Sequence, residues 1–134
     1  MAEDERIDDE SIPNTDRLFR RVTPNQLNDN PDGTKRPSSA VFKTTELSVN
    51  IESLMIEQGR LPENGLEGYP NNYLTSIIVC DVRSFGYPIV KDTKPPEDPA
   101  HGLVLGKKSD GFAKKMAKNL STWIVEPPKV SAEK

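Results

Sequence analysis

The strongest constraint on the fold lies in residues 101–118, where the sequence pattern changes from that of a strand to that of a helix. Residues 102–106 form a short apolar run bounded by glycines, which is typical of a buried strand. A basic turn follows, and apolar side chains then recur at every fourth position, as on one face of a helix. We therefore predict a strand, a turn over 107–109 and an amphipathic helix that buries Phe112, Met116 and Leu120.

Five further apolar segments predict most of a sheet. The run 74–83 is nearly continuous and rich in β-branched residues, so we expect a central strand there. A first helix is predicted after a cap at Ser48 or Asn50, and Gly59 ends it. Strands that come in runs between two helices indicate the α+β class, with a mixed, mainly antiparallel sheet of about five to six strands. The predicted strands cover 18–22, 40–43, 74–83, 89–90, 102–106 and 123–125.

Composition divides the chain into one domain and two tails. Residues 1–16 carry seven acids and one arginine with few large apolar groups, so we expect a flexible acidic tail. The net charge of the whole chain is −3, so the remaining residues together are mildly basic. Residues 17–126 are predicted to form a single α+β domain, with a long loop over 23–37, and residues 127–134 a flexible C-terminal tail.

The same composition indicates a cytoplasmic protein. No apolar run approaches the roughly 18 residues of a membrane span, and the chain begins without the basic and apolar regions of a secretory signal. Cys80 is the single cysteine, and its apolar neighbours predict a buried, inert thiol. A chain without a disulfide framework fits a reducing compartment.

The basic turn is the sharpest candidate for anion binding. The start of a helix presents free backbone N–H groups and a partial positive charge, which attract anions. Lys107 and Lys108 add charge there, and Ser109 adds a hydroxyl and a helix cap. The turn is not a Walker A loop, because Gly102 and Gly106 are separated by only three strand-forming residues and a second lysine intervenes. A plain capped turn is the alternative interpretation.

Two further cationic pairs precede this turn. Arg20 and Arg21 are adjacent on the first predicted strand, so their side chains point to opposite faces. The arginine on the apolar face needs a carboxylate or phosphate partner, unless the strand lies at an edge and the side chain reaches water. A second cluster combines cations with hydroxyls, which can hold a phosphate or simply begin a polar strand. It comprises Lys35, Arg36, Ser38 and Ser39.

His101, the only histidine, is a weak catalytic candidate. A general base of this kind needs an orienting carboxylate, and the acids that we consider for this role are Asp81, Glu97 and Asp98. The standard zinc ligand sets require several histidines or cysteines, which the chain lacks, so we expect no metal site and no cofactor.

Three segments carry a resemblance to known groups. The runs Leu18-Phe-Arg-Arg, Arg36-Pro-Ser-Ser-Ala-Val-Phe and Asp98-Pro-Ala-His-Gly-Leu-Val-Leu-Gly-Lys-Lys-Ser resemble segments of small, uncharacterised bacterial proteins and would cover most of residues 17–125. This resemblance implies no activity. An arginine on a first strand and a Ser-Ser pair on a second also resemble the ADP-ribosyltransferase layout, but the nicotinamide-clamping and glutamate motifs of that family are not recognisable.

These observations lead to three functional hypotheses. The first is a small non-catalytic bacterial binding module, which engages an anionic partner, a protein or a nucleic acid, through its basic residues. The second is a nucleotide- or NAD-processing domain, in which His101 acts together with the arginine pair and the serine pair. The third is a structural subunit that packs in a larger assembly, whose mark would be an exposed apolar patch.

Overall fold

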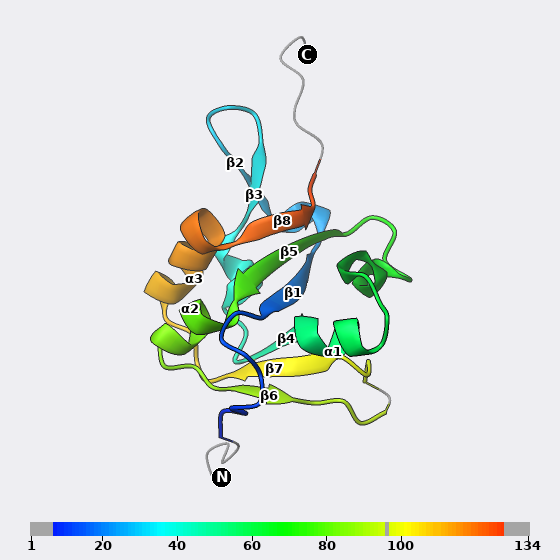
Figure 1. Cartoon of the computed structure of the whole chain (residues 1–134). Coiled ribbons are helices and arrows are strands. Elements are labelled where there is room, and N and C mark those ends of the chain that lie inside the picture. Colours follow the sequence, from blue (N-terminus) through cyan, green and yellow to red (C-terminus); the bar gives the residue numbers. More distant parts are fainter. Residues whose placement is uncertain (1–6, 96, 128–134) are drawn as a thin grey trace.

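A computed structural model of the chain describes residues 7–95 and 97–127, and its centre is a six-stranded antiparallel sheet. The strand order is β6-β7-β4-β1-β5-β8, which runs from bottom to top in Figure 1. Together with three helices this confirms the α+β class, although every strand pair is antiparallel and the sheet is not mixed. The strands are β1 (Arg17–Val22), β4 (Glu46–Ile51), β5 (Tyr73–Ile78), β6 (Ile89–Lys91), β7 (His101–Leu105) and β8 (Thr122–Val125).

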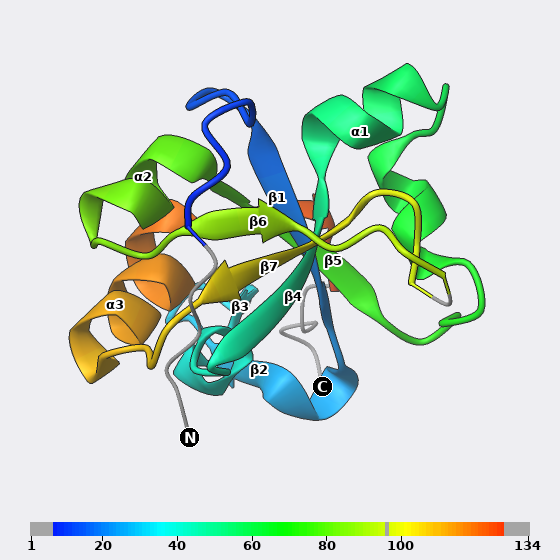
Figure 2. The same ribbon diagram turned by 90° about the horizontal axis from the view of Figure 1, so that it is seen from below.

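Helices cover both faces of this twisted sheet. Figure 2 shows α2 (Val79–Ser84) and α3 (Asp110–Lys115) on one side of the central strands, and α1 (Glu52–Glu57) on the other. A π-helical turn, η4 (Met116–Leu120), continues α3. Short 3₁₀ helices complete the connections; they are η1 (Pro24–Gln26), η2 (Ser39–Phe42) and η3 (Pro62–Leu66). None of the helices in the described ranges combines the length and the apolar character needed to cross a membrane.

The main hydrophobic core lies between the sheet and the side that carries α2 and α3. Successive residues of a strand alternate between faces, so Leu18 and its partner Ile51 point into this core together. Phe112 and Met116 enter it from α3 and η4, as the helical spacing predicts. The opposite face carries a smaller cluster that includes Phe19 and Met55.

The predicted end residues of two helices are confirmed, and one predicted cap is wrong. Ser109 caps α3, because its Oγ accepts a hydrogen bond from the backbone N–H of Phe112 at 3.0 Å. Gly59 follows α1 with a φ of +67°, a left-handed conformation that favours glycine, as predicted. The proposed caps of α1 are wrong, because Ser48 and Asn50 lie inside β4 and Ile51 precedes the helix.

One predicted strand is wrong, and a second is correct only in its first half. Residues 40–43 belong largely to the 3₁₀ helix η2, which still buries Val41 and Phe42, so burial was correct and conformation was not. The run 74–83 changes from β5 to α2 after Ile78, because an apolar run does not distinguish a buried strand from a buried helix. Cys80 consequently lies on α2 and is exposed rather than buried.

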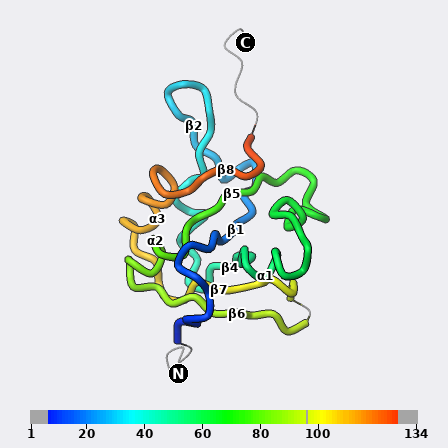
Figure 3. Tube along the Cα trace, viewed as in Figure 1, coloured from blue at the N-terminus to red at the C-terminus, as the bar shows by residue number. Residues whose placement is uncertain are grey.

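Two segments expected to be irregular have defined structure. Residues 23–37 contain a hairpin of β2 (Leu27–Asp29) and β3 (Lys35–Pro37), which projects from the body in Figure 1. In the predicted acidic tail, residues 7–16 lie against the fold, as the blue part of the tube in Figure 3 shows. Ile12 is fully buried there, and the Arg83 guanidinium donates to the backbone carbonyls of Asp9 and Ile12 at 2.9 Å each. Residues 1–6 and 128–134, the rest of both predicted tails, lie outside the described residues.

Candidate functional site

The sheet face opposite the main core carries a row of polar side chains. The strand register places Phe19 of β1 opposite Asn50 of β4, and Asn50 opposite His101 of β7. Arg21 follows Phe19 by two positions and therefore lies on the same face, opposite Leu74 of β5. Three neighbouring strands thus contribute a guanidinium, an amide and an imidazole to one surface.

Residues 60–69 turn this surface into a cleft of about 440 Å³. The segment includes η3 and contributes Asn64, Gly65 and Tyr69 to the lining, opposite the row on the sheet. Volumes of roughly 300–1,000 Å³ are typical of sites for small molecules. The remaining lining residues that carry charge are Arg60, Glu67, Glu97 and Asp98.

Asn50 is the most informative residue of the cleft. The residue is 8% exposed, yet its side-chain amide forms no hydrogen bond with any other residue that the structure describes. The amide is not sealed from solvent, because no buried side-chain N or O atom of the described residues lacks a partner. A polar group at this depth normally has a partner, since burial without one costs free energy. The Asn50 amide is therefore a donor and acceptor available to a molecule in the cleft.

Arg21 supplies a positive charge close by. Its guanidinium carbon lies 4.0 Å from the centroid of the Tyr69 ring, and Nη1 donates to the Gly65 carbonyl at 3.4 Å. It forms no ion pair with a carboxylate in the described ranges. A guanidinium held by an aromatic face and one carbonyl retains donors that fit a carboxylate or phosphate.

The other arginine of the cleft is already neutralised. Arg60 binds Asp98 with two hydrogen bonds of 2.8 Å, and Asp98 Oδ1 also accepts from the Ala100 N–H at 2.7 Å. The bond from Arg60 holds the pKa of Asp98 below its usual value, and Asp98 raises the pKa of Arg60 in return. This pair fixes residues 60 and 98–100 to each other and forms one wall of the site.

His101 has the orienting carboxylates that a general base requires. Its Nδ1 lies 3.1 Å from Asp92 Oδ2, 3.1 Å from the Asp92 carbonyl and 3.7 Å from Glu97 Oε1. Of the three acids considered from the sequence, Glu97 is near His101, whereas Asp81 lies on α2 and Asp98 binds Arg60. Asp92 was missed, because nothing in the spacing shows that the proline-rich segment folds back over nine residues.

The predicted anion site at the start of α3 is wrong for Lys108. Its side chain is 2% exposed, and Nζ donates to the carbonyls of Thr44, Thr45, Val104 and Gly106 at 3.0, 3.0, 2.9 and 2.5 Å. The Ser109 N–H is also occupied, because it donates to the Tyr87 hydroxyl at 2.8 Å. Lys107 is the exposed cation of this turn.

Arg20 lies on the other face of β1 from Arg21, as the alternation predicts. Its Nε donates to the Val41 carbonyl at 3.3 Å and its Nη1 to the Ser48 carbonyl at 3.0 Å, so carbonyl oxygens replace the predicted anionic partner. Burial, and to a lesser extent the charge of Arg21, lower the pKa of Arg20. Arg20 is therefore occupied by the fold and does not line the cleft.

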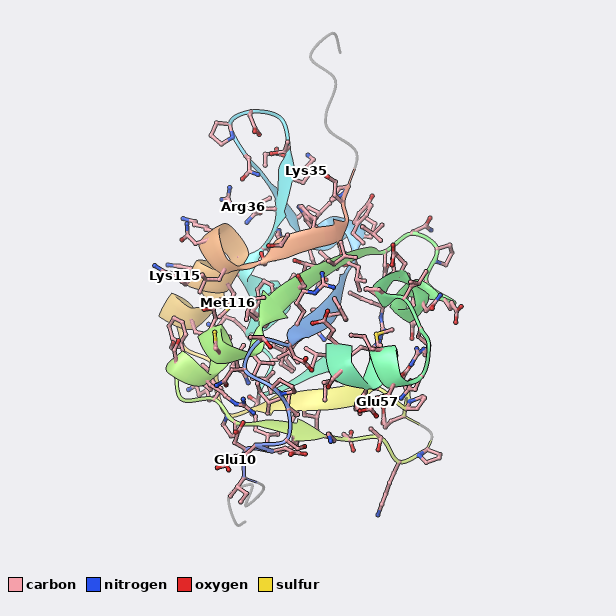
Figure 4. The ribbon with its side chains drawn as sticks, in the orientation of Figure 1. Glu10, Lys35, Arg36, Glu57, Lys115 and Met116 are labelled. Carbon is pink, nitrogen blue, oxygen red and sulfur yellow. The ribbon has the colours of Figure 1, made fainter. Side chains whose placement is uncertain are left out.

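The remaining predicted cations lie on the hairpin and do not join the cleft. Lys35 pairs with Asp29, and Arg36 donates to the Asn30 side chain at 2.8 Å. Figure 4 shows Lys35 and Arg36 there, far from Glu57 at the end of α1. Both line a separate groove of about 250 Å³ beside η4 and β8. The predicted basic residues thus do not form one continuous surface, and Lys108 is buried.

The predicted serine pair does not belong to the cleft. Ser38 and Ser39 lie at the start of η2 rather than on a second strand, and neither lines the cleft, so the layout that resembles ADP-ribosyltransferases is incomplete.

No family model, no curated protein and no solved structure matches the chain. The function is therefore inferred from the cleft itself.

Proposed function

We propose that this protein is a small binding module that holds a small organic anion in the cleft between the sheet and residues 60–69. The observation that carries the proposal is the Asn50 amide, which is deeply placed and has no hydrogen-bond partner among the described residues. The Arg21 guanidinium is the counterion for the ligand, and the Asn50 amide fixes its orientation. The volume of about 440 Å³ favours a small molecule over a protein or nucleic-acid partner, which would meet the dispersed surface cations instead.

The binding test uses inorganic phosphate, citrate and AMP as probes. Each is titrated into ¹⁵N-labelled protein, and we expect saturable shifts of the Asn50 side-chain NH₂ and the Arg21 Nε–H signals. Arg21→Gln removes a charge-assisted hydrogen bond worth roughly 1.5–3 kcal/mol, so affinity should fall about 10-fold or more. The matched control is Lys107→Gln, which removes an exposed cation outside the cleft and should leave affinity unchanged.

Gly65→Ala tests the cleft without changing its charge. A Cβ at this position would lie 2.9 Å from Asn50 Nδ2, so the added methyl group would obstruct the amide from the opposite wall. We expect the probes to bind at least 10-fold more weakly to this variant, with the backbone spectrum otherwise preserved. Equal loss of affinity in Lys107→Gln, or shifts confined to the hairpin cations, would contradict the proposal.

A second candidate function, nucleotide or NAD processing, is favoured by the His101–Asp92 pair at the same cleft. His101 Nε2, which has no hydrogen-bond partner among the residues described, would act as general base, and Arg21 would bind a phosphate. Purified protein is incubated with NAD or ATP and the products are separated by chromatography. Turnover that falls about 100-fold or more in His101→Gln, but not in Glu63→Gln, an exposed acid of η3 outside the cleft lining, supports this function. Product formation that is equal in both variants would reject it.

The cellular setting belongs to the proposal as well. We place the protein in the reducing cytoplasm of a bacterium, which the single cysteine and the resemblance to bacterial segments support. A role as a packing subunit in a larger assembly stays a prediction. Its test is the mass of the protein in solution by light scattering, at concentrations near those in the cell.

A further inference from the structure

The geometry points to a divalent transition-metal site formed by Asp92, Glu97 and His101 at the mouth of the cleft. Each residue offers one ligand atom, and the three atoms all lie within 4.8 Å of one another. Asp92 follows β6 directly, His101 begins β7, and the segment between them returns Glu97 to the same place. The site is thus built by the connection of two paired strands, which fixes two of its three ligands through the sheet.

The distances between the ligand atoms match those around a metal ion. Zinc–nitrogen and zinc–oxygen bonds of about 2.0–2.2 Å place two ligands about 3.0 Å apart in octahedral and about 3.4 Å apart in tetrahedral coordination. Here His101 Nδ1 lies 3.1 Å from Asp92 Oδ2 and 3.7 Å from Glu97 Oε1. Small side-chain rotations would therefore suffice to close the set around one ion.

The donor types select the class of metal. An imidazole nitrogen suits zinc and its neighbours in the first transition row, whereas carboxylates alone would suit magnesium or calcium. One imidazole and two carboxylates neutralise a divalent cation and leave coordination positions open. The set contains a single histidine and no cysteine, so it lies outside the standard zinc ligand sets that sequence spacing predicts.

The burial of these side chains supports a shared role. The His101 side chain is 13% exposed, and those of Asp92 and Glu97 are 34% and 47% exposed, so the imidazole forms the base of the site and the carboxylates its rim. Since Glu97 and His101 also line the cleft, a bound cation would face the ligand there; this last step rests on the proposed function.

The experiment uses Zn²⁺ alone and Mn²⁺ as a spectroscopic probe. Isothermal titration of the metal-free chain with Zn²⁺ should show one saturable site. His101→Gln and Asp92→Asn should each weaken it at least 10-fold, whereas the control Glu63→Gln, an exposed acid of η3 that does not line the cleft, should not change it. In the unaltered protein, Mn²⁺ should broaden amide signals around residues 92, 97 and 101 first.

Two results would overturn the site: Zn²⁺ affinity that is unchanged in His101→Gln, or Mn²⁺ broadening centred on the acidic residues near the N-terminus. A second titration separates this inference from the proposed function. Phosphate affinity is measured with and without one equivalent of Zn²⁺, and we expect it to rise about 10-fold with the metal. Metal binding without this rise would support the metal site and reject its link to the cleft. Phosphate binding without metal binding would support the proposed function and reject the metal site.

Discussion

Lys108→Met is expected to lower the free energy of unfolding by about 3 kcal/mol. The buried ammonium group donates to four backbone carbonyls, which join residues 44 and 45 to the end of β7, and it lies 5.1 Å from the centroid of the Tyr87 ring. Methionine preserves the length of the side chain but donates no hydrogen bond. The loss of several charge-assisted bonds therefore outweighs the relief of a buried charge.

Urea denaturation monitored by circular dichroism measures this effect. Lys107→Met provides the control, because it removes the neighbouring lysine, which is exposed, and should change stability by less than about 0.5 kcal/mol. Equal stability of the two variants would mean that the carbonyl oxygens around Lys108 find water as readily as they find the ammonium group.

The same lysine gives stability a defined pH dependence. Burial lowers the pKa of Lys108 to about 8, whereas the unfolded chain keeps the ordinary value of 10.5. Between these values the unfolded state binds more protons, so the free energy of unfolding should rise with pH, by at most about 3 kcal/mol, and stay level below pH 8. The measurement is the stability difference between the unaltered protein and Lys108→Met from pH 7 to 10.5. A difference that falls across this range would contradict the assignment.

Phe112→Ala is expected to destabilise the fold by about 3–5 kcal/mol. The ring is fully buried where α3 meets the core, and it makes edge contacts with Tyr87 at 4.7 Å and Phe85 at 5.2 Å between centroids. Its loss would leave a cavity beneath the helix that carries the basic turn. Thermal and urea unfolding both report the change.

A matched variant identifies the cause of that loss. Phe85→Ala removes the same ring from a position that is 40% exposed, so about 1 kcal/mol is expected. If both variants lose the same stability, the aromatic contact rather than the buried volume determines the effect. If neither loses stability, α3 does not pack on the core as described.

The predictable part of the fold was the part with a strong periodic pattern. The strand at β7, the capped helix after it and the strand at β8 follow from apolar spacing and from the Ser109 cap. The errors fall where one pattern fits two structures, as in the run 74–83. Lys107 and Lys108 are adjacent residues of the same type, and the contact of Lys108 with the carbonyls of residues 44 and 45 is what distinguishes the buried one.

The candidate site was only half predictable, for a similar reason. The residue types of Arg21 and His101 predict binding or catalytic roles, and the structure brings both to one cleft. The sequence predicts Asn50 to be a helix cap, since a polar residue before an apolar helical pattern favours that interpretation. Its place between Phe19 and His101 depends on the register of three strands that are distant in sequence, which no local pattern reveals.

The N-terminal segment covers part of the outer edge of the sheet at β6, and this bears on aggregation of the protein. The Ile89 carbonyl accepts from the Asp9 N–H at 2.8 Å, and the Ile89 N–H donates to Asp8 Oδ1 at 3.0 Å, so this segment occupies the outer border of β6. A chain that begins at residue 17, the domain boundary that composition predicts, would leave the Ile89 N–H and carbonyl without these partners. Exposed strand edges can pair with strands of other copies, so we expect a chain that begins at residue 17 to aggregate more readily than the full chain.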